Sequence, residues 1–435
     1  MATTRPDPRN VRPVDMAAAL NTLELPTYDE LFIELREHLT STGCLAVILI
    51  DLSEISQIAI RHGSRNNDRL MDLVGREIVH LRSTVLQSND AIALSDQSGD
   101  AFVIFLAPRH GSELPLPQYS EQLADQLQRA LNQRLTSAFP RGSFNEARVT
   151  AGYSLVVHNP LLPVTSLLQR AVDDAQHAAC LNRLHQETQN KQRLQQIILE
   201  EDIRTVFQPI VDLSSNQVHG FEALARGPSR SALESPLALF SLATKTDLLF
   251  ELDQVCRRKS VQHAAKLASP CKLFINTLPF SIRDPQFQGK FLLELLEGSE
   301  LLPERIVLEV TETLAIDDYT AYLEEMQYFS DMGFLTGIDD LGTGYSGLER
   351  VVQLRPDYLK LDMLMVRDID TSVVKQDIMR AFCAMAKNIG AAVVAEGVET
   401  KQELETVREV GVDYVQGFYL ARPSDSFHTG VRAEN

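Results

Sequence analysis

The sequence has 435 residues, of which 44% are hydrophobic, so it can form two domains of ordinary size with a buried core in each. Its 41 Lys and Arg stand against 59 Asp and Glu, and the formal net charge of −18 argues against a long nucleic acid as partner. The 5 cysteines are scattered and form no C-x-x-C pair, which predicts neither a disulfide framework nor a zinc site. No stretch approaches the roughly 18 apolar residues of a membrane span. We therefore interpret the chain as a cytoplasmic protein.

The first part of the chain predicts a flexible tail followed by an α+β domain. Residues 1–24 are polar and rich in proline. The elements expected next are a buried strand at 44–54, an amphipathic helix at 68–85, two strands around a Ser-Gly-Asp turn at 90–107, a helix at 119–139 and a strand at 146–158. We place the first domain at residues 25–185.

The second part of the chain alternates between strands and helices. The pattern is helical from Val164 to Asp202, and its polar portion at 186–198 predicts a connecting helix. Over residues 199–430, β-branched runs recur about every 20 to 35 residues, which predicts an α/β domain with parallel strands and a TIM-like (β/α) barrel. The expected strands are 205–213, 219–224, 272–276, 305–310, 334–340, 357–362, 391–397 and 413–420.

Polar side chains lie at or near the ends of these predicted strands. They are Glu222, Asn276, Glu309, Asp339, Asp340, Lys360, Glu396 and Gln416. The carboxyl ends of the strands of a (β/α) barrel meet on one face, so we expect these side chains to share one pocket. Clustered carboxylates raise each other's pKa, and hard dications such as Mg²⁺ or Mn²⁺ relieve that repulsion. Two such metals are the usual apparatus for cleaving phosphodiesters.

Each of these residues also has a purely structural interpretation. An acidic residue after a strand often caps the next helix. The run GTGYSG at 342–347 could cradle a phosphate, but it lacks the Gly-Lys-Ser/Thr ending of a P-loop, and its glycines favour loop mobility. Lys360 could lie on the surface, but it alternates with apolar neighbours in YLKLD, which favours a side chain that points into the barrel mouth.

Several motifs in order resemble the EAL domain of cyclic di-GMP phosphodiesterases. They are FEALARG, IDDLGTGYSGL, YLKLD, VVAEGVET and VQGFYLARP, and the resemblance extends over about residues 199–426. It implies a TIM-like barrel that hydrolyses cyclic di-GMP to linear pGpG with Mg²⁺ or Mn²⁺. The metal ligands that it implies are Glu222, Asn276, Glu309, Asp339 and Asp340.

The same resemblance implies roles for further residues. Glu396 would be the general base for the attacking water, and Lys360 would position that water and stabilise charge. Arg226 would contact a substrate phosphate, for which its planar donor fork is suited. The remaining implied residues are Gln416 and Glu399, which complete the surroundings of the metals, and Glu312, which holds the loop after the Asp pair.

The first domain resembles a degenerate GGDEF domain, the fold of diguanylate cyclases. QSGDAF stands at the signature position, with Ser98 in place of the first glycine and Ala101 in place of an acidic metal ligand. Asp51 remains as the other metal-binding carboxylate. Near Asp90, Gln87 stands where the inhibitory site of the family has an arginine. We expect no cyclase activity and a regulatory or dimerising role.

Two functions from different classes follow from the sequence. The favoured one is a phosphodiesterase, and the alternative is a non-catalytic cyclic di-GMP receptor that signals to an unidentified protein partner. All the implied metal ligands are present, whereas Leu341 and Gly347 depart from the family pattern and put the turnover rate in question. The resemblance also implies a homodimer formed through the EAL domain.

Overall fold

The computed structural model describes residues 25–55, 89–95, 100–108, 115–138, 148–278, 301–311, 319–341 and 347–427, with a few single positions between them. The chain divides into two compact units, Met1–Asn190 and Lys191–Asn435. Each unit has its own hydrophobic clusters. The helix expected at 68–85 and residue Glu312 lie largely or wholly outside the described residues.

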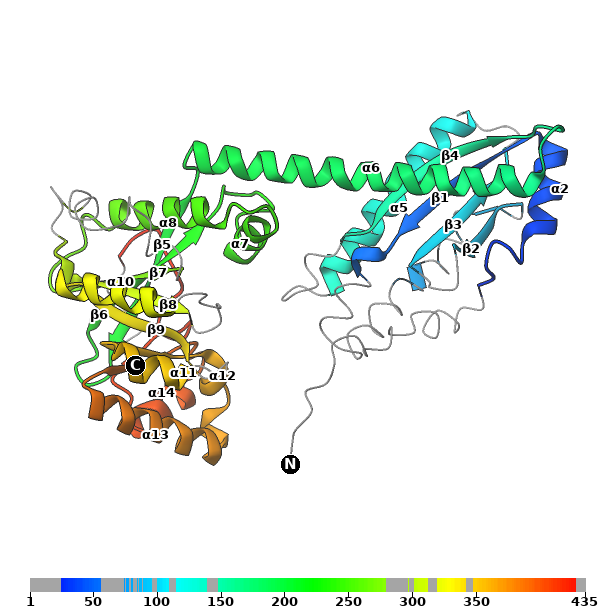
Figure 1. Cartoon of the computed structure of the whole chain (residues 1–435). Coiled ribbons are helices and arrows are strands. Elements are labelled where there is room, and N and C mark those ends of the chain that lie inside the picture. Colours follow the sequence, from blue (N-terminus) through cyan, green and yellow to red (C-terminus); the bar gives the residue numbers. More distant parts are fainter. Residues whose placement is uncertain are drawn as a thin grey trace, which may run out of the picture. The chain divides into compact units, whose positions relative to one another are not determined.

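The first unit is built on a four-stranded sheet with the order β2-β3-β1-β4 (Figure 1). All of its strand pairs are antiparallel. The elements are α2 (Phe32–Thr42), β1 (Cys44–Asp51), β2 (Ala91–Leu94), β3 (Ala101–Leu106), α5 (Leu116–Ala138), β4 (Thr150–Val157) and α6 (Val164–Leu199). The strands expected at 44–54, 90–107 and 146–158 and the helix expected at 119–139 are therefore confirmed.

Helices cover both faces of this sheet because its central strand is apolar on both sides. Side chains of β1 alternate between two hydrophobic clusters, as the period of two in a strand requires. One cluster joins Ala46, Ile48 and Ile50 to α5, and the other joins Leu45, Val47 and Leu49 to α2 and the first part of α6. The continuous run CLAVILID is thus explained by burial on both faces.

Helix α6 continues from the first unit across the boundary at residue 190. Its first part packs closely on β4, where a Cβ at Gly152 would lie 2.2 Å from the carbonyl oxygen of Ala175. The side chains of residues 187–193 are all exposed, and burial resumes at Leu194 in a cluster of the second unit. The polar stretch expected to connect the domains is therefore one part of a single 36-residue helix.

The second unit is a closed barrel of eight strands. Their order around the barrel is β10-β11-β12-β5-β6-β7-β8-β9. The strands are β5 (Arg204–Asp212), β6 (Val218–Arg226), β7 (Lys272–Thr277), β8 (Ile306–Thr311), β9 (Leu335–Leu341), β10 (Tyr358–Leu361), β11 (Ala392–Ala395) and β12 (Tyr414–Val415). Each matches an expected strand, and the predicted barrel is confirmed.

One expectation about the barrel is wrong: its strands are not all parallel. β5 runs antiparallel to both β6 and β12. The connection from Asp212 to Val218 is a short turn, which joins antiparallel strands and is far too short for a parallel crossover. Asp212 Oδ1 accepts hydrogen bonds from the backbone N–H groups of Ser214 and Ser215 at 2.7 and 2.9 Å, and Asn216 takes the left-handed conformation with φ 56°.

The helices of the second unit pack outside the barrel. A separate layer of apolar side chains fills part of the barrel interior. The helices are α7 (Pro236–Lys245), α8 (Leu249–His263), α10 (Tyr319–Asp331), α11 (Gly347–Leu354), α12 (Met363–Val366), α13 (Val373–Ile389) and α14 (Lys401–Glu409), with short 3₁₀ helices at Pro303–Arg305 and Ile369–Thr371. The interior layer includes Ile210, Phe274, Val307, Tyr358 and Val394. This layer closes the floor beneath the polar side chains described next.

Candidate active site

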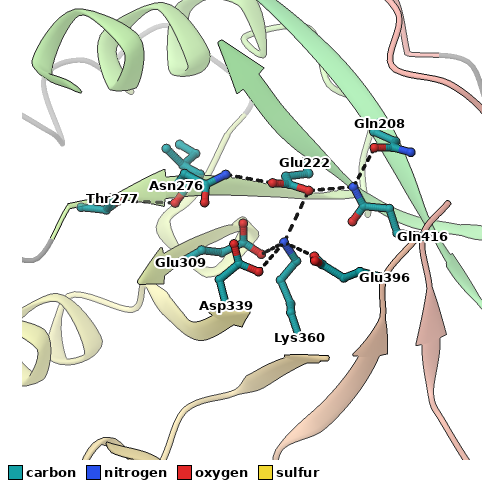
Figure 2. A network of polar contacts seen from close by, with 10 residues as sticks. Gln208, Glu222, Asn276, Thr277, Glu309, Asp339, Lys360, Glu396 and Gln416 are labelled. Carbon is teal, nitrogen blue, oxygen red and sulfur yellow. Dashed lines mark hydrogen bonds and ion pairs between the residues drawn. The ribbon is translucent and has the colours of Figure 1, made fainter. Parts of the chain in front are cut away.

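A ring of polar side chains from separate strands of the barrel surrounds the ammonium group of Lys360 (Figure 2). Along the parallel strands, four of the polar residues follow an inward apolar one by two positions: Asn276 follows Phe274, Glu309 follows Val307, Lys360 follows Tyr358 and Glu396 follows Val394. The same spacing brings together residues from separate strands of the barrel. Among the residues labelled in Figure 2 are Glu222, Asn276, Glu309, Asp339, Lys360, Glu396 and Gln416.

Lys360 lies at the centre of this ring, with a side chain that is only 1% exposed. Its ammonium group contacts carboxylates from four different segments of the barrel. The distances from Nζ to the nearest oxygen are 3.4 Å for Glu222, 3.0 Å for Glu309, 3.1 Å for Asp339 and 2.5 Å for Glu396. Because one cation faces three buried carboxylates and the partly buried carboxylate of Glu396, the described residues leave the cluster with an excess of negative charge.

Two amide side chains hold Glu222 in place. Asn276 Nδ2 donates a hydrogen bond to Glu222 Oε1 at 2.8 Å, and Gln416 Nε2 donates one to Glu222 Oε2 at 2.7 Å. Burial alone would raise the pKa of Glu222, but Lys360 and the two amides outweigh it and lower that pKa. Glu222 is therefore the carboxylate of the cluster that is best stabilised as an anion.

The other carboxylates are less well compensated. Burial, only partly offset by Lys360, raises the pKa of Glu309, Asp339 and Glu396, and their mutual repulsion adds to the effect. Burial likewise raises the pKa of Asp340 to about 7, together with the charges of Asp339 and Asp362. The side chains at this end of the barrel thus need a further cation in order to be ionised together.

The arrangement of carboxylate oxygens fits divalent cations. Among the residues that the structure describes, two groups of three carboxylates have ligand atoms within 4.8 Å of one another, and they share Asp339. One group is Glu222, Glu309 and Asp339, and the other is Asp339, Asp340 and Glu396. Glu309 is completely buried, and its Oε2 has no hydrogen-bond partner among the described residues. An all-oxygen set of this kind suits Mg²⁺ or Mn²⁺.

Three further residues were expected at the site, namely Arg226, Glu399 and Glu312. Arg226, at the end of β6, lines a cavity of about 150 Å³ that Asn276 also borders. Burial lowers the pKa of its guanidinium group, and its Nη1 donates to the carbonyl of Ala225 at 2.8 Å. The side chain of Glu399 is exposed, and its backbone N–H donates to Glu403. Glu312 falls outside the described residues.

One member of the polar ring, Gln208 on β5, was not among the residues singled out from the sequence. It is 7% exposed and accepts a hydrogen bond from Gln416 at 3.1 Å. The other polar residues of the ring lie at or near the ends of parallel strands, whereas Gln208 lies inside the antiparallel strand β5 and precedes the floor residue Ile210. The sequence feature that indicates Gln208 is a polar residue within the otherwise apolar run VFQPIV.

The comparison with known families decides where this barrel belongs. The family described as the EAL domain matches residues 191–423, which is more than half of the chain. The chain belongs to the EAL-domain family. Hereafter residues 191–435 are called the EAL unit. The resemblance inferred from FEALARG and the later motifs is thereby confirmed, with the polar ring on the strands that those motifs form.

Curated relatives extend the similarity to both units. The cyclic di-GMP phosphodiesterase NbdA of Pseudomonas aeruginosa is 26% identical over 413 residues, covering 91% of this chain and 51% of that protein. The probable cyclic di-GMP phosphodiesterase PdeA of Escherichia coli is 28% identical over 280 residues, covering 61% of this chain and 37% of that protein. The chain spans about half the length of the first curated relatives that it matches. The names of these relatives support the enzyme class expected from the sequence.

A solved structure agrees with the fold of the EAL unit. The EAL domain of FimX from Xanthomonas citri, in complex with c-diGMP, has a TM-score of 0.52 and 22% sequence identity. The match covers 57% of this chain and 99% of that chain. At this identity the similarity concerns the fold alone. Among the described residues of both units, no helix has the length and apolar character needed to cross a membrane.

Proposed function

We propose that the EAL unit hydrolyses one phosphodiester bond of cyclic di-GMP and releases linear pGpG. The observation that carries this proposal is the pair of three-carboxylate groups that share Asp339. Glu222, Asn276, Glu309, Asp339 and Asp340 would hold Mg²⁺ or Mn²⁺. When bound, such ions polarise phosphoryl oxygens and lower the pKa of a coordinated water.

The chain's own residues then divide the work of hydrolysis. Water would add to phosphorus while the bond from phosphorus to the 3′ oxygen breaks. One proton of the water would pass to the carboxylate of Glu396, and the leaving 3′ oxygen would take a proton from solvent. Glu396 belongs to the carboxylate group with Asp339 and Asp340, so it would stand beside the proposed metals as a base for the attacking water. The ammonium group of Lys360, 2.5 Å from Glu396, orients the base and counters charge that develops on the phosphoryl group.

The cavity beside the ring supports a nucleotide substrate. Its walls combine the apolar side chains of Pro236, Phe240 and Ile275 with the guanidinium group of Arg226. An aromatic ring and aliphatic groups suit a base, and a planar donor fork suits a phosphate. Asn276 borders both this cavity and the carboxylates, so a nucleotide placed in the cavity would have its phosphate near the proposed metals.

The direct test is an assay of the full chain with cyclic di-GMP and Mn²⁺ or Mg²⁺, in which pGpG is separated by chromatography. We expect pGpG to form and its formation to stop when EDTA is added. Tight binding of cyclic di-GMP without any product, at every metal concentration tested, would refute hydrolysis and leave the receptor function in its place.

For the first unit we propose a degenerate GGDEF-like domain that does not synthesise cyclic di-GMP. Asp51, the one carboxylate retained for metal binding, already has a partner on α6. Arg183 Nη1 lies 3.4 Å from Asp51 Oδ2 and 3.3 Å from the hydroxyl of Ser53. The guanidinium group therefore neutralises the carboxylate that would otherwise hold Mg²⁺ beside a triphosphate. A role as a regulatory or dimerising scaffold is what remains.

We expect the full chain to form no cyclic di-GMP from GTP and Mg²⁺, because a single carboxylate paired with Arg183 cannot hold two metal ions. The measurement is chromatography of the reaction after long incubation with the EAL unit inactivated by Glu396→Gln. Synthesis of cyclic di-GMP under these conditions would contradict the prediction.

We also propose that the EAL unit forms a homodimer through α12 and α13. Large apolar side chains are exposed there, namely Leu364, Val373, Val374 and Ile378, which are 41–68% exposed. A group of exposed apolar side chains on neighbouring helices is typical of an interaction surface. The helices α12 and α13 that carry this surface follow β10, and so they come after Asp339 and Asp340 in the chain.

A charge within this surface should break the dimer. We expect Val374→Glu to weaken self-association about tenfold or more, because the carboxylate would be desolvated in an apolar interface. Sedimentation equilibrium of the full chain measures the effect, and Leu237→Glu, at an exposed position on α7, is the matched control. Equal dimerisation of both variants and the native chain would place the interface elsewhere.

A further inference from the structure

Gln208 occupies a place in the polar ring that the proposed chemistry does not use. Because β5 runs antiparallel to its neighbours, Gln208 precedes the floor residue Ile210 by two positions and still lies above it. Its cross-strand partner on β6 is Glu222. The reversed strand thus supplies a buried amide at the level of the carboxylates, beside Gln416 (Figure 2).

The hydrogen bonds of Gln208 fix which way its side-chain amide is turned. Its Nε2 donates to the backbone carbonyl of Ala421 at 3.2 Å, so its own carbonyl oxygen points the opposite way. That oxygen accepts a hydrogen bond from Gln416 Nε2 at 3.1 Å, and the same Nε2 donates to Glu222 Oε2 at 2.7 Å. A primary amide has two N–H donors, so both donors of Gln416 are committed to these two acceptors.

The carbonyl oxygen of Gln416 is left free by this arrangement. Gln416 is 5% exposed, and its Oε1 has no hydrogen-bond partner among the described residues. Figure 2 shows this oxygen on the side of the amide that is turned toward Lys360 and Glu396. A buried carbonyl oxygen without a partner is unfavourable, which points to a ligand that completes it.

We propose that Gln208 is a positioning residue that sets the orientation of the Gln416 amide. In this orientation the carbonyl oxygen of Gln416 faces the acidic cluster as a ligand for a divalent cation. If the amide of Gln416 turned over, its oxygen would face the Gln208 carbonyl and the Glu222 carboxylate, and two acceptors would repel it. Gln208 therefore acts on the metal through Gln416 and does not touch it. This inference rests on the metal site of the proposed function.

Binding of Mn²⁺ alone tests the inference, with free Mn²⁺ measured by electron paramagnetic resonance on the full chain without nucleotide. We expect Gln208→Met, which removes the acceptor, to weaken Mn²⁺ binding about 10- to 100-fold, as loss of an outer hydrogen-bond partner typically does. In the Gln416→Met background the same change should have no further effect, since the group that it orients is gone. Thr205→Val, at a buried position of the same strand, is the control for packing and should bind Mn²⁺ like the native chain.

Several results would overturn the inference. They are an unchanged affinity in Gln208→Met, an equal loss in Thr205→Val, or a loss that persists undiminished in the Gln416→Met background. Should Gln208→Met fail to fold, Gln208→Glu keeps the acceptor oxygen and should retain most of the affinity, so a loss as large as tenfold would count against the inference. If the native chain binds no Mn²⁺, both the metal site of the proposed function and this inference are refuted. If the native chain and Gln208→Met bind Mn²⁺ equally well, only this inference is refuted.

Discussion

The Glu396→Gln variant is expected to hydrolyse cyclic di-GMP with a kcat about 10² to 10⁴ times lower than that of the native chain. Glutamine has the same shape as glutamate but cannot accept the proton of the attacking water. The side chain of Glu396 is 18% exposed and its carboxylate lies 2.5 Å from Lys360, so it is held in one place near the proposed metals. Steady-state measurement of pGpG release gives the effect on kcat.

One further measurement separates the role of Glu396 as a base from a role as a metal ligand. Glu396 also belongs to the carboxylate group with Asp339 and Asp340, so Mn²⁺ affinity must be determined for the same variant. If the affinity is retained and kcat falls, the general-base role stands. The control is Glu405→Gln on α14, whose side chain is 54% exposed and which should leave kcat unchanged. A Glu396→Gln variant with native kcat would refute the role.

The Lys360→Met variant is expected to lose about 3 to 5 kcal/mol of unfolding free energy in EDTA, as well as its activity. The native ammonium group contacts three buried carboxylates and the partly buried carboxylate of Glu396, and methionine leaves them without a cation. The pKa of Glu309 is already raised by burial, and it will rise further. Because the folded state of the variant then binds more protons than the unfolded state, its deficit should shrink as the pH is lowered.

Urea denaturation in EDTA and in Mn²⁺ measures this effect. Mn²⁺ should restore more stability to Lys360→Met than it adds to the native chain, since the ion supplies the charge that the lysine provided. Lys401→Met removes a lysine that is 53% exposed and should change the unfolding free energy by no more than about 0.5 kcal/mol. Equal stability of Lys360→Met and the native chain in EDTA would show that the four ion pairs are compensated from elsewhere.

The sequence predicted the barrel and most of its polar ring for a clear physical reason. The period of two along a strand sets which side chains share a face, and the rule that parallel strands present their carboxyl ends together sets where those side chains meet. Glu222, Asn276, Glu309, Asp339 and Lys360 were all found in this way, and the structure places them together. Glu399 had no such support from periodicity, and its side chain is exposed.

The direction of β5 was beyond the reach of that reasoning. A strand's apolar pattern is the same whichever way the strand runs, and only the closure of the barrel with β12 and β6 on either side shows that β5 is reversed. Its reversal is what brings Gln208 to the level of Gln416. The pairing of Asp51 with Arg183 was hidden for a similar reason, because 132 residues separate the two positions in the sequence.

By itself, then, the amino-acid sequence determined the order of strands and helices, the two units, the EAL-domain family and the identity of the acidic residues, because each of these depends on local periodicity or on short motifs. Only the tertiary structure decided that one lysine ion-pairs with four carboxylates, that the carboxylates form two groups sharing Asp339, and that a buried amide on a reversed strand directs Gln416. These features depend on distances between side chains from different strands. The sequence specifies those distances only through the packing of the whole barrel.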